Sequence, residues 1–295
     1  MSAHPRPRRS VLYVPASNPR AIDKARGLPC DAVVLDLEDA VAPEMKVAAR
    51  QTALEAVRTG GFGPRELVVR VNALDTEWGA ADLEALSRSG CDAILAPKVR
   101  TPDDVRAYEA ALDGAPAALR LWAMIETALS IFRLEQIAAT RYDTRLACFV
   151  MGTNDLAREL RMRLDVERTP MAALLGLTVA AARAHGLAAL DGVFNDFEDA
   201  SGFECQCRQG LDFGFDGKTL IHPRQIGACN TVFSPSAAEV DWAQRVEAEF
   251  ARPENAHKGA LRLDGTMIER LHLAQARQVL ALEAAIRAAS VAHSS

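Results

Sequence analysis

The sequence predicts an α/β protein built as a (β/α)8 barrel (TIM barrel) with a C-terminal helical extension. Short runs rich in β-branched and other apolar residues recur along the chain, and each is followed by an Ala-, Leu- and Arg-rich stretch with helical spacing. Most runs are apolar throughout, as in a parallel sheet covered on both faces. Eight such units fit into about 230 residues, the usual size of this barrel.

The elements follow one another in strict alternation. The eight predicted strands lie at residues 11–14, 32–37, 67–71, 93–97, 121–125, 147–151, 188–193 and 219–221. The helices predicted between them cover 19–26, 46–59, 77–89, 102–112, 128–140, 171–185 and 203–211. A doubly wound open sheet is the alternative, but no G-x-G-x-x-G motif follows the first strand to support dinucleotide binding. We therefore predict a closed barrel.

The C-terminal part of the chain departs from this alternation. Residues 233–295 contain two amphipathic helix patterns joined by a connection with Pro, Asn and Gly. We expect a barrel domain at 1–232, and a helical segment at 233–295 that covers the barrel mouth or packs on a neighbouring subunit.

Composition excludes several classes of protein. The 295 residues include 34 basic and 39 acidic ones, for a net charge of -5, so there is no basic surplus to bind nucleic acid. No stretch reaches the roughly 18 apolar residues of a membrane span, and no apolar region follows the N-terminal arginines. The six cysteines lack the spacing of a disulfide scaffold. We expect a soluble, cytoplasmic protein that binds neither nucleic acid nor membrane.

Polar side chains follow nearly every predicted strand. In this fold the chemistry lies at the C-terminal ends of the strands, so these side chains converge on one rim. They are, in chain order, Asp36, Glu38, Asp39, Arg70, Asn72, Lys98, Glu126, Asn154, Asp155, Asn195, Asp196 and His222.

Two of these carboxylates suit a divalent cation. Glu126 and Asp155 follow adjacent strands, and two carboxylates with room for water are a typical Mg2+ site. Arg70 offers a planar donor for a carboxylate or a developing enolate oxygen. The alternative is a salt bridge between Glu126 and Arg70 that only braces the barrel top. Arg20 and Lys24, on the helix after the first strand, could hold the phosphates of a long ligand or could lie on a solvated face.

These residues carry a family resemblance. The chain resembles the citrate lyase β-subunit and malyl-CoA/citramalyl-CoA lyase group of the HpcH/HpaI aldolase superfamily. The matching segments include RRSVLYVPASNPRAIDKA at 8–25, LEDAVAPEMK at 37–46, MIETA at 124–128, GTNDLA at 152–157 and GFDGKTLIHPRQI at 214–226. The resemblance runs from Arg9 to about Leu280, and the order of these motifs makes it specific.

The resemblance implies a Mg2+-dependent carbon-carbon lyase that cleaves or forms a 3-hydroxyacyl-CoA such as citramalyl-CoA, malyl-CoA or a citryl thioester. The products are an acyl-CoA and a keto acid or glyoxylate. Glu126 and Asp155 match the metal ligands of the family, and Arg70 matches its substrate-holding catalytic arginine. Further matches are Tyr13, Lys24, Asn154, Ile221 and His222 around the substrate, with Asp36, Glu38 and Asp39 orienting Arg70 or metal-bound water. Trimers or hexamers are common in the family.

Two departures bear on the chemistry. Asn18 stands where malyl-CoA lyases carry a basic residue, so contacts with CoA need not be the same. The lyases use an aspartate of a C-terminal MID segment as general acid/base, and here LDGTMIERL places Glu269 at that position. The extra methylene of glutamate changes its reach, and an error of about 1 Å in placement can cost 100-fold in rate. Asp264 is the alternative acid.

Three other functions compete with this prediction. The chain could be an aldolase acting on free hydroxy-keto acids, or a non-catalytic relative that binds CoA esters. Lys98 could instead form a Schiff base if burial lowered its pKa. The sequence leaves open the acyl group, the thioester carrier, the direction of reaction and the size of the oligomer.

Overall fold

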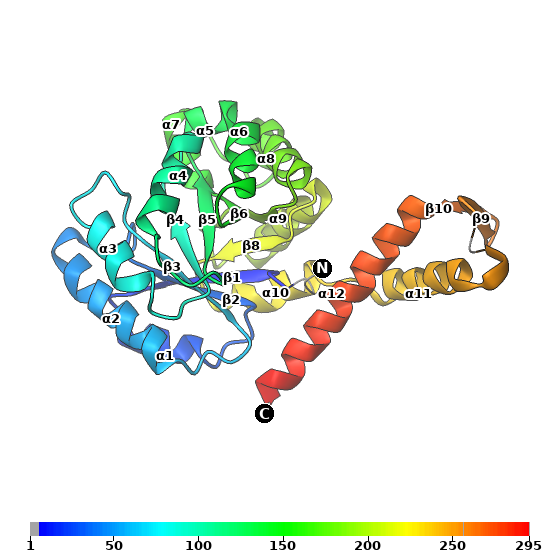
Figure 1. Cartoon of the computed structure of the whole chain (residues 1–295), viewed down its shortest axis with the longest axis horizontal. Helices are drawn as coiled ribbons and strands as arrows, with labels where there is room; N and C mark the ends of the chain where they lie inside the picture. Colours follow the sequence, from blue (N-terminus) through cyan, green and yellow to red (C-terminus); the bar gives the residue numbers. More distant parts are fainter. Residues whose placement is uncertain (1–5, 256, 295) are drawn as a thin grey trace. The chain divides into compact units, whose positions relative to one another are not determined.

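The computed structural model describes residues 6–255 and 257–294 of the 295-residue chain (Figure 1). The chain divides into two compact units, one formed by Arg8–Phe233 and the other containing the chain from Ser234 onward. Each unit has a hydrophobic core of its own.

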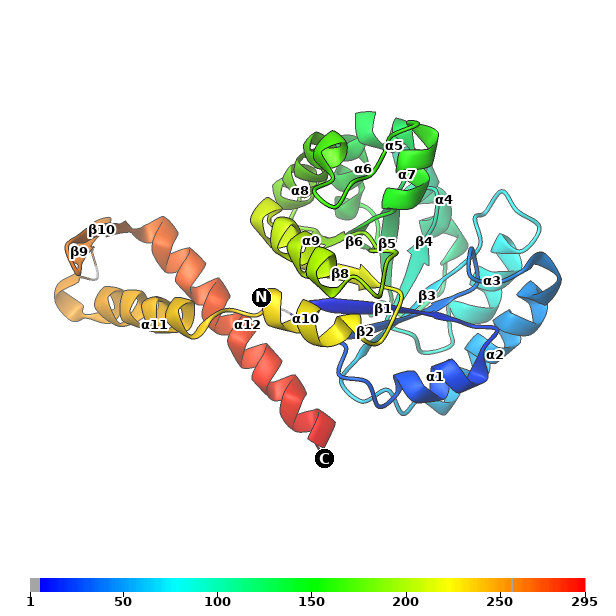
Figure 2. The ribbon, with the colours of Figure 1, turned by 180° about the vertical axis from the view of Figure 1, so that it is seen from behind.

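The first unit is a closed barrel of eight parallel strands in the order β1 to β8, with β8 pairing back on β1. The strands are β1 (Ser10–Pro15), β2 (Ala32–Asp36), β3 (Glu66–Arg70), β4 (Ala93–Ala96), β5 (Arg120–Ile125), β6 (Leu146–Met151), β7 (Ala188–Asp191) and β8 (Gly217–Leu220). Figures 1 and 2 show the helices on the outside of these strands. The predicted (β/α)8 fold is therefore confirmed.

Two cores follow from the alternation of side chains along each strand. Val34 and Trp122 belong to the cluster inside the barrel, whereas Val33 belongs to the larger cluster between strands and helices. At the N-terminal end of the strands, the Arg8 guanidinium lies 5.1 Å from the centre of the Trp122 ring and pairs with Glu66 at 2.6 Å. The interior is filled at this end, and the candidate site lies at the other.

Ten helices accompany these strands, and most lie where the spacing of apolar residues predicts them. They are α1 (Pro19–Ala25), α2 (Lys46–Thr59), α3 (Gly79–Leu86), α4 (Pro102–Ala111), α5 (Ala128–Phe132), α6 (Leu134–Ala139), α7 (Thr153–Glu159), α8 (Ala172–Ala184), α9 (Ala200–Phe213) and α10 (Gln225–Val232). The single helix predicted at 128–140 is wrong, since α5 and α6 are separated at Arg133, where φ is -119°. Two further helices, α7 and α10, lie outside the predicted ranges and were missed.

The second unit is a helix, a hairpin and a long helix. Its elements are α11 (Ala237–Ala251), β9 (Ala260–Leu263), β10 (Thr266–Glu269) and α12 (Arg270–Ser294). The connection predicted as a loop forms an antiparallel hairpin, because Asp264 and Gly265 both adopt positive φ, of 49° and 84°, as a tight Asp-Gly turn requires. Leu261 and Ile268 pack between the helices. No helix in the described residues is both long and apolar enough to cross a bilayer.

Candidate active site

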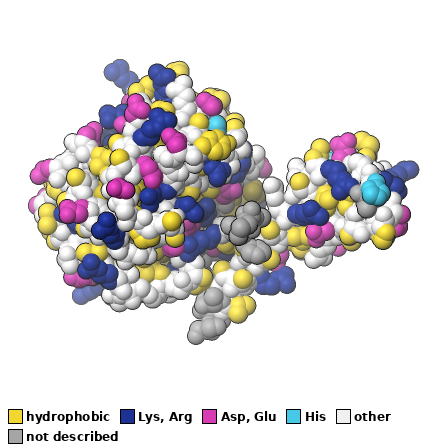
Figure 3. Space-filling view, in the orientation of Figure 1, with side chains coloured by type: hydrophobic (Ala, Val, Ile, Leu, Met, Phe, Trp, Pro, Cys, Tyr) yellow, Lys and Arg dark blue, Asp and Glu magenta, His cyan; other side chains and the backbone are white. Residues whose placement is uncertain are grey.

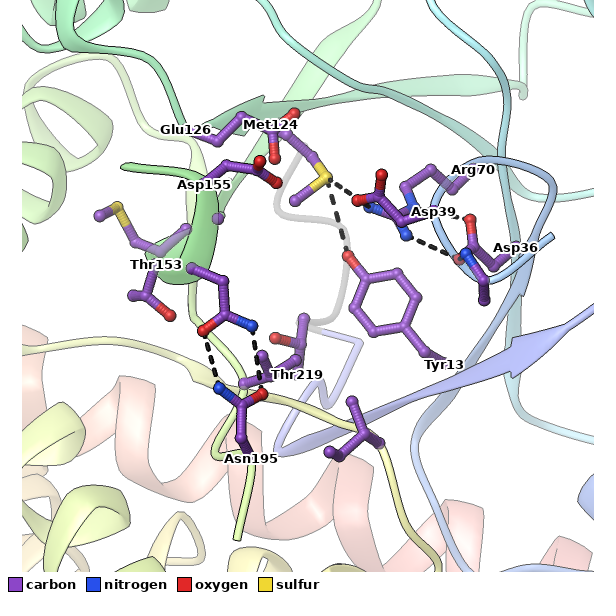
Figure 4. A pocket seen from close by; sticks show the side chains of 16 residues that line it. Tyr13, Asp36, Asp39, Arg70, Met124, Glu126, Thr153, Asp155, Asn195 and Thr219 are labelled. Carbon is purple, nitrogen blue, oxygen red and sulfur yellow. Dashed lines mark hydrogen bonds and ion pairs between the residues drawn. The ribbon is translucent and has the colours of Figure 1, made fainter. Parts of the chain in front are cut away.

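A cavity of about 280 Å³ opens at the C-terminal end of the barrel strands. It is lined by Tyr13, Asp36, Asp39, Ala40, Arg70, Met124, Glu126, Met151, Gly152, Thr153, Asn154, Asp155, Val193, Asn195, Thr219 and Ile221. These residues come from the ends of β1 to β3 and β5 to β8 and from the segments that follow them. Of the twelve polar residues predicted at the strand ends, seven line the cavity, and Figure 4 shows how the side chains face one another. The five that do not line it are Glu38, Asn72, Lys98, Asp196 and His222.

Glu126 is a deeply buried carboxylate of the cavity, with 1% of its surface exposed. Its Oε1 accepts a hydrogen bond of 2.7 Å from the backbone N–H of Lys98. Its Oε2 is buried and has no hydrogen-bond partner among the described residues. Burial, reinforced by the nearby Glu38 carboxylate, raises the pKa of Glu126 to about 7. A buried carboxylate oxygen without a partner suits a bound cation.

Asp155 lies next to Glu126 in Figure 4. It is in the first turn of α7, and Arg158 on the same helix pairs with it at 2.5 Å. In the described part of the chain, no three His, Cys, Asp or Glu side chains form a group that could hold a metal. A cation held by Glu126 and Asp155 would therefore complete its coordination with water or substrate oxygens, which Mg2+ tolerates well. The donor set and the unpartnered Oε2 fit Mg2+.

Gly152 explains how β6 approaches Glu126 so closely. A Cβ atom at this position would lie 2.5 Å from the Oε2 of Glu126. Only glycine leaves room for the carboxylate here, because that separation is far below van der Waals contact. The GTND segment therefore supplies both the space for Glu126 and, three residues later, Asp155.

Arg70 lies across the cavity, and three carboxylates surround its guanidinium. Its Nε and Nη2 donate to the two oxygens of Asp36 at 2.7 and 2.6 Å, and its Nη1 lies 2.8 Å from Glu38 and 3.3 Å from Asp39. Burial alone lowers the pKa of Arg70, but these carboxylates outweigh it and raise the pKa above its ordinary value. The alternative expectation of a bracing salt bridge between Glu126 and Arg70 is wrong, because Asp36, Glu38 and Asp39 occupy the guanidinium.

Tyr13 forms the floor below Arg70. The guanidinium carbon lies 4.9 Å from the centre of the Tyr13 ring, a cation–π contact. Burial raises the pKa of the Tyr13 phenol, so the ring is neutral at physiological pH. Asp36 and Glu38, predicted to orient Arg70, are in contact with it, and Asp39 also lines the cavity.

The opposite wall carries a pair of amides. Asn154 and Asn195 donate to each other's side-chain oxygens at 3.1 and 2.9 Å, and both line the cavity. Figure 4 shows Asn195 and Thr219 on the far side of the cavity from Arg70. Ile221 also lines the cavity and is 39% exposed, which places it at the mouth.

Several predicted residues are not brought into the cavity. Lys24 is exposed on α1, and His222 stacks on Phe197 with 4.7 Å between ring centres. Neither residue lines the cavity. Glu269 and Asp264 belong to the second unit, where the Asp264 carboxylate pairs with Arg245. The roles assigned to these four residues stay predictions.

The proposed Schiff-base chemistry of Lys98 requires that burial lower its pKa, and this expectation is wrong. The amine pairs with Glu38, and the Lys98 side chain is 40% exposed. Burial is the largest single effect and lowers the pKa of Lys98, but the hydrogen bond and charge of Glu38, together with the charges of Glu126 and Asp39, outweigh it, so the pKa is raised. A protonated amine held by a carboxylate is not the neutral nucleophile that this chemistry needs.

Sequence reasoning also misses part of the cavity wall. Met124, Met151, Thr153, Val193 and Thr219 line it without being predicted. The signal was present, because residues two apart on a strand face the same side. Met124 precedes Glu126 by two positions, and Thr219 precedes Ile221 by two.

Comparison with known proteins agrees with this geometry. Residues 9–223 match the profile of the HpcH/HpaI aldolase/citrate lyase family. The chain is 49% identical to (3S)-malyl-CoA thioesterase of Cereibacter sphaeroides over 98% of its own length and 99% of that protein. It is 37% identical to the citrate lyase subunit beta of Escherichia coli, over 93% of each chain. The chain belongs to the HpcH/HpaI aldolase/citrate lyase family.

A solved structure gives a similar result. The crystal structure of the protein CitE from Mycobacterium tuberculosis, in complex with magnesium, acetoacetate and coenzyme A, matches with a TM-score of 0.74 and 29% identity. The match covers 93% of this chain and 97% of that one.

Proposed function

We propose that this chain is a Mg2+-dependent enzyme acting on the CoA thioester of a short 3-hydroxy acid, of the malyl-CoA type. The observation that carries the proposal is the 49% identity to (3S)-malyl-CoA thioesterase along 98% of the chain. The cavity of about 280 Å³ has room for the acyl group and the thioester, while the rest of the coenzyme would lie outside it.

Glu126 and Asp155 are the proposed ligands of Mg2+. The free Oε2 of Glu126 supports this assignment, as does the magnesium in the related CitE complex. When bound, the ion supplies a Lewis acid that polarises oxygens of the acyl group.

Figure 3 shows acidic and basic side chains interspersed on one face of the molecule, and the net charge of -5 leaves no basic surplus for nucleic acid.

Arg70 is the proposed partner of the thioester oxygen. Negative charge develops on that oxygen both when water attacks the thioester carbon and when the bond between C2 and C3 breaks to leave an enolate. A guanidinium whose orientation is fixed by Asp36 and Glu38 needs no reorganisation to receive this charge. Tyr13 and the amides of Asn154 and Asn195 would complete the walls around the acyl group.

Two reactions are compatible with this arrangement, and we place thioester hydrolysis first, because the relatives at 49% identity are named thioesterases. In hydrolysis, water adds to the thioester carbon, the C–S bond breaks, and coenzyme A leaves as a thiol with one proton of the water. The hydroxyl from the water stays on the former thioester carbon, which becomes the carboxyl group of the free hydroxy acid.

Carbon-carbon cleavage is the second candidate, favoured by the 37% identity to a citrate lyase subunit. In that reaction the 3-hydroxyl gives its proton to a general base and becomes the carbonyl of glyoxylate or a keto acid as the bond between C2 and C3 breaks. C2 of the resulting enolate takes up a proton from a general acid to give the acyl-CoA. Glu269 is the proposed proton donor, with Asp264 as the alternative. We also propose that Lys24, Ile221 and His222 contact the substrate, and that segment 233–295 closes the barrel mouth in a homotrimer or homohexamer.

The test is to identify products by mass spectrometry from malyl-CoA, citramalyl-CoA and citryl-CoA. Malate and free coenzyme A from malyl-CoA would support hydrolysis, whereas acetyl-CoA with glyoxylate would support cleavage. No turnover of any thioester would contradict the proposal and leave a free-acid aldolase or a non-catalytic CoA-ester binder.

A further inference from the structure

Lys98 has an unusual backbone conformation beside the cavity. It follows β4 and has a φ of 52°, in the left-handed region that side chains other than glycine and asparagine seldom adopt. Such conformations persist only where the surroundings impose them, and they gather at functional sites. The contacts of Lys98 show what this conformation achieves.

The backbone N–H of Lys98 reaches Glu126. It donates to Oε1 at 2.7 Å, which leaves Oε2 as the oxygen without a partner in the described residues. Gly152 lies against the same carboxylate, since a Cβ atom there would be 2.5 Å from Oε2. Glu126 is therefore held between the end of β4 and the end of β6, with one specific oxygen left open.

The side chain of Lys98 reaches the other half of the site. Its ammonium pairs with Oε1 of Glu38, and Oε2 of Glu38 lies 2.8 Å from Arg70. Glu38 is only 7% exposed, so its charge must be balanced inside the protein. The positive charges of Lys98 and Arg70 together balance the negative charge of Glu38.

We propose that Lys98 is a positioning residue that joins the proposed metal-binding half of the site, at Glu126, to the Arg70 half. Its backbone N–H orients Glu126 so that Oε2 is presented to the cation. Its ammonium fixes Glu38 and, through it, the direction of the Arg70 guanidinium. This inference rests on the proposed function, and it assigns Lys98 no covalent step.

Three substitutions separate the two contacts of Lys98. Lys98→Met and Lys98→Gly both remove the ammonium but keep a backbone N–H, and glycine adopts a positive φ without strain. Lys98→Val also removes the ammonium, but its β-branched side chain opposes positive φ and would move the N–H away from Glu126. Arg106→Met, at a 52% exposed position on α4, is the matched control for loss of a cation.

Mg2+ affinity, measured by isothermal titration calorimetry, tests the backbone contact. We expect Lys98→Gly and Lys98→Met to keep the wild-type Kd within about threefold, and Lys98→Val to weaken it by about 10- to 100-fold, the usual effect of losing a group that orients a metal ligand. Thermal melting checks that each variant is folded. Equal Mg2+ affinity for Lys98→Val and Lys98→Met would overturn this part of the proposal.

Steady-state kinetics at saturating Mg2+ test the ammonium. We expect Lys98→Met to lower kcat by about 10- to 100-fold with a smaller change in KM, because Arg70 then loses its alignment in the transition state. Lys98→Arg should restore part of the rate, and Arg106→Met should match the wild type. Unchanged kcat in Lys98→Met would contradict the proposal, whereas a wild-type protein that binds no Mg2+ would contradict the proposed function itself.

Discussion

Asp36 holds Arg70 by two parallel hydrogen bonds, with Nε to Oδ1 at 2.7 Å and Nη2 to Oδ2 at 2.6 Å. The two side chains are 1% and 7% exposed. This geometry matches the two donors of a guanidinium to the two acceptors of a carboxylate, the strongest arrangement for such a pair. It leaves Nη1 as the part of Arg70 that carries the contacts to Glu38 and Asp39.

Removing the charge of Asp36 should therefore destabilise the protein and misalign Arg70. We expect Asp36→Asn to lower the free energy of unfolding by about 3 kcal/mol, because it leaves the buried guanidinium short of a partner. Urea denaturation at pH 7 measures the change. Asp103→Asn, which affects an exposed pair with Arg106, should cost at most about 1 kcal/mol, and equal effects of the two substitutions would contradict this account.

Glu126 should make stability depend on pH in the absence of metal. Its pKa is raised from 4.5 to about 7, so the folded state binds the proton more tightly than the unfolded state, and stability falls as pH rises between these values. We expect Glu126→Gln to be more stable than wild type above pH 7, by the order of 3 kcal/mol, and to gain little below pH 4.5. Melting curves in EDTA at a series of pH values measure the difference in stability. If the stabilities of wild type and Glu126→Gln change in parallel with pH, burial does not raise the pKa of Glu126.

The approach of β6 to Glu126 predicts an effect of a single methyl group. In Gly152→Ala the new Cβ would collide with the Glu126 carboxylate, so we expect Mg2+ affinity to fall by about 10-fold or more. Gly227→Ala is the control, because nothing lies within 4 Å of a Cβ built at that position. Titration calorimetry compares the two. Wild-type affinity in Gly152→Ala would show that Glu126 is not the ligand.

Glu269 should influence which reaction the site performs. It lies on the same face of its hairpin strand as Met267, which is 66% exposed, whereas Ile268 points into the core of the unit. We expect Glu269→Gln to lower carbon-carbon cleavage by about 100-fold, the usual contribution of a general acid, and Glu269→Asp to raise cleavage relative to hydrolysis. Mass spectrometry measures the ratio of cleavage products to hydrolysis products in each protein. A ratio that is unchanged in both variants would show that Glu269 takes no part in the reaction.

The strand ends explain why so much of the site was predictable. Glu126 and Asp155 follow clear apolar runs, and parallel strands bring their C-terminal ends together whatever the details of packing. The partner of Arg70 was not predictable in this way. The family resemblance suggested Asp36, but the strand ends alone left Glu126, which follows β5 two strands away, as an alternative partner. The observed register, with Asp36 of the neighbouring β2 opposite Arg70, shows which carboxylate meets the guanidinium.

Other features depend on backbone conformation that apolar spacing does not encode. The left-handed φ of Lys98 follows from its tertiary contacts, so the sequence indicated a polar strand end but not a donor to Glu126. The hairpin at Asp264 and Gly265 carried a recognisable Asp-Gly signal, but its two strands are only four residues long. The neighbouring helix patterns obscured so short an element.

The central claim is that Glu126 and Asp155 hold a Mg2+ ion which the enzyme requires to act on a malyl-CoA-type thioester. The most direct measurement is kcat/KM for (3S)-malyl-CoA in wild type, Glu126→Ala and Asp155→Asn, each with Mg2+ and with EDTA, beside Mg2+ titration calorimetry of the same proteins. We predict turnover by the wild type with Mg2+ alone, and loss of both Mg2+ binding and turnover in each variant. Full turnover by the wild type in EDTA, or by Glu126→Ala with Mg2+, would contradict the claim.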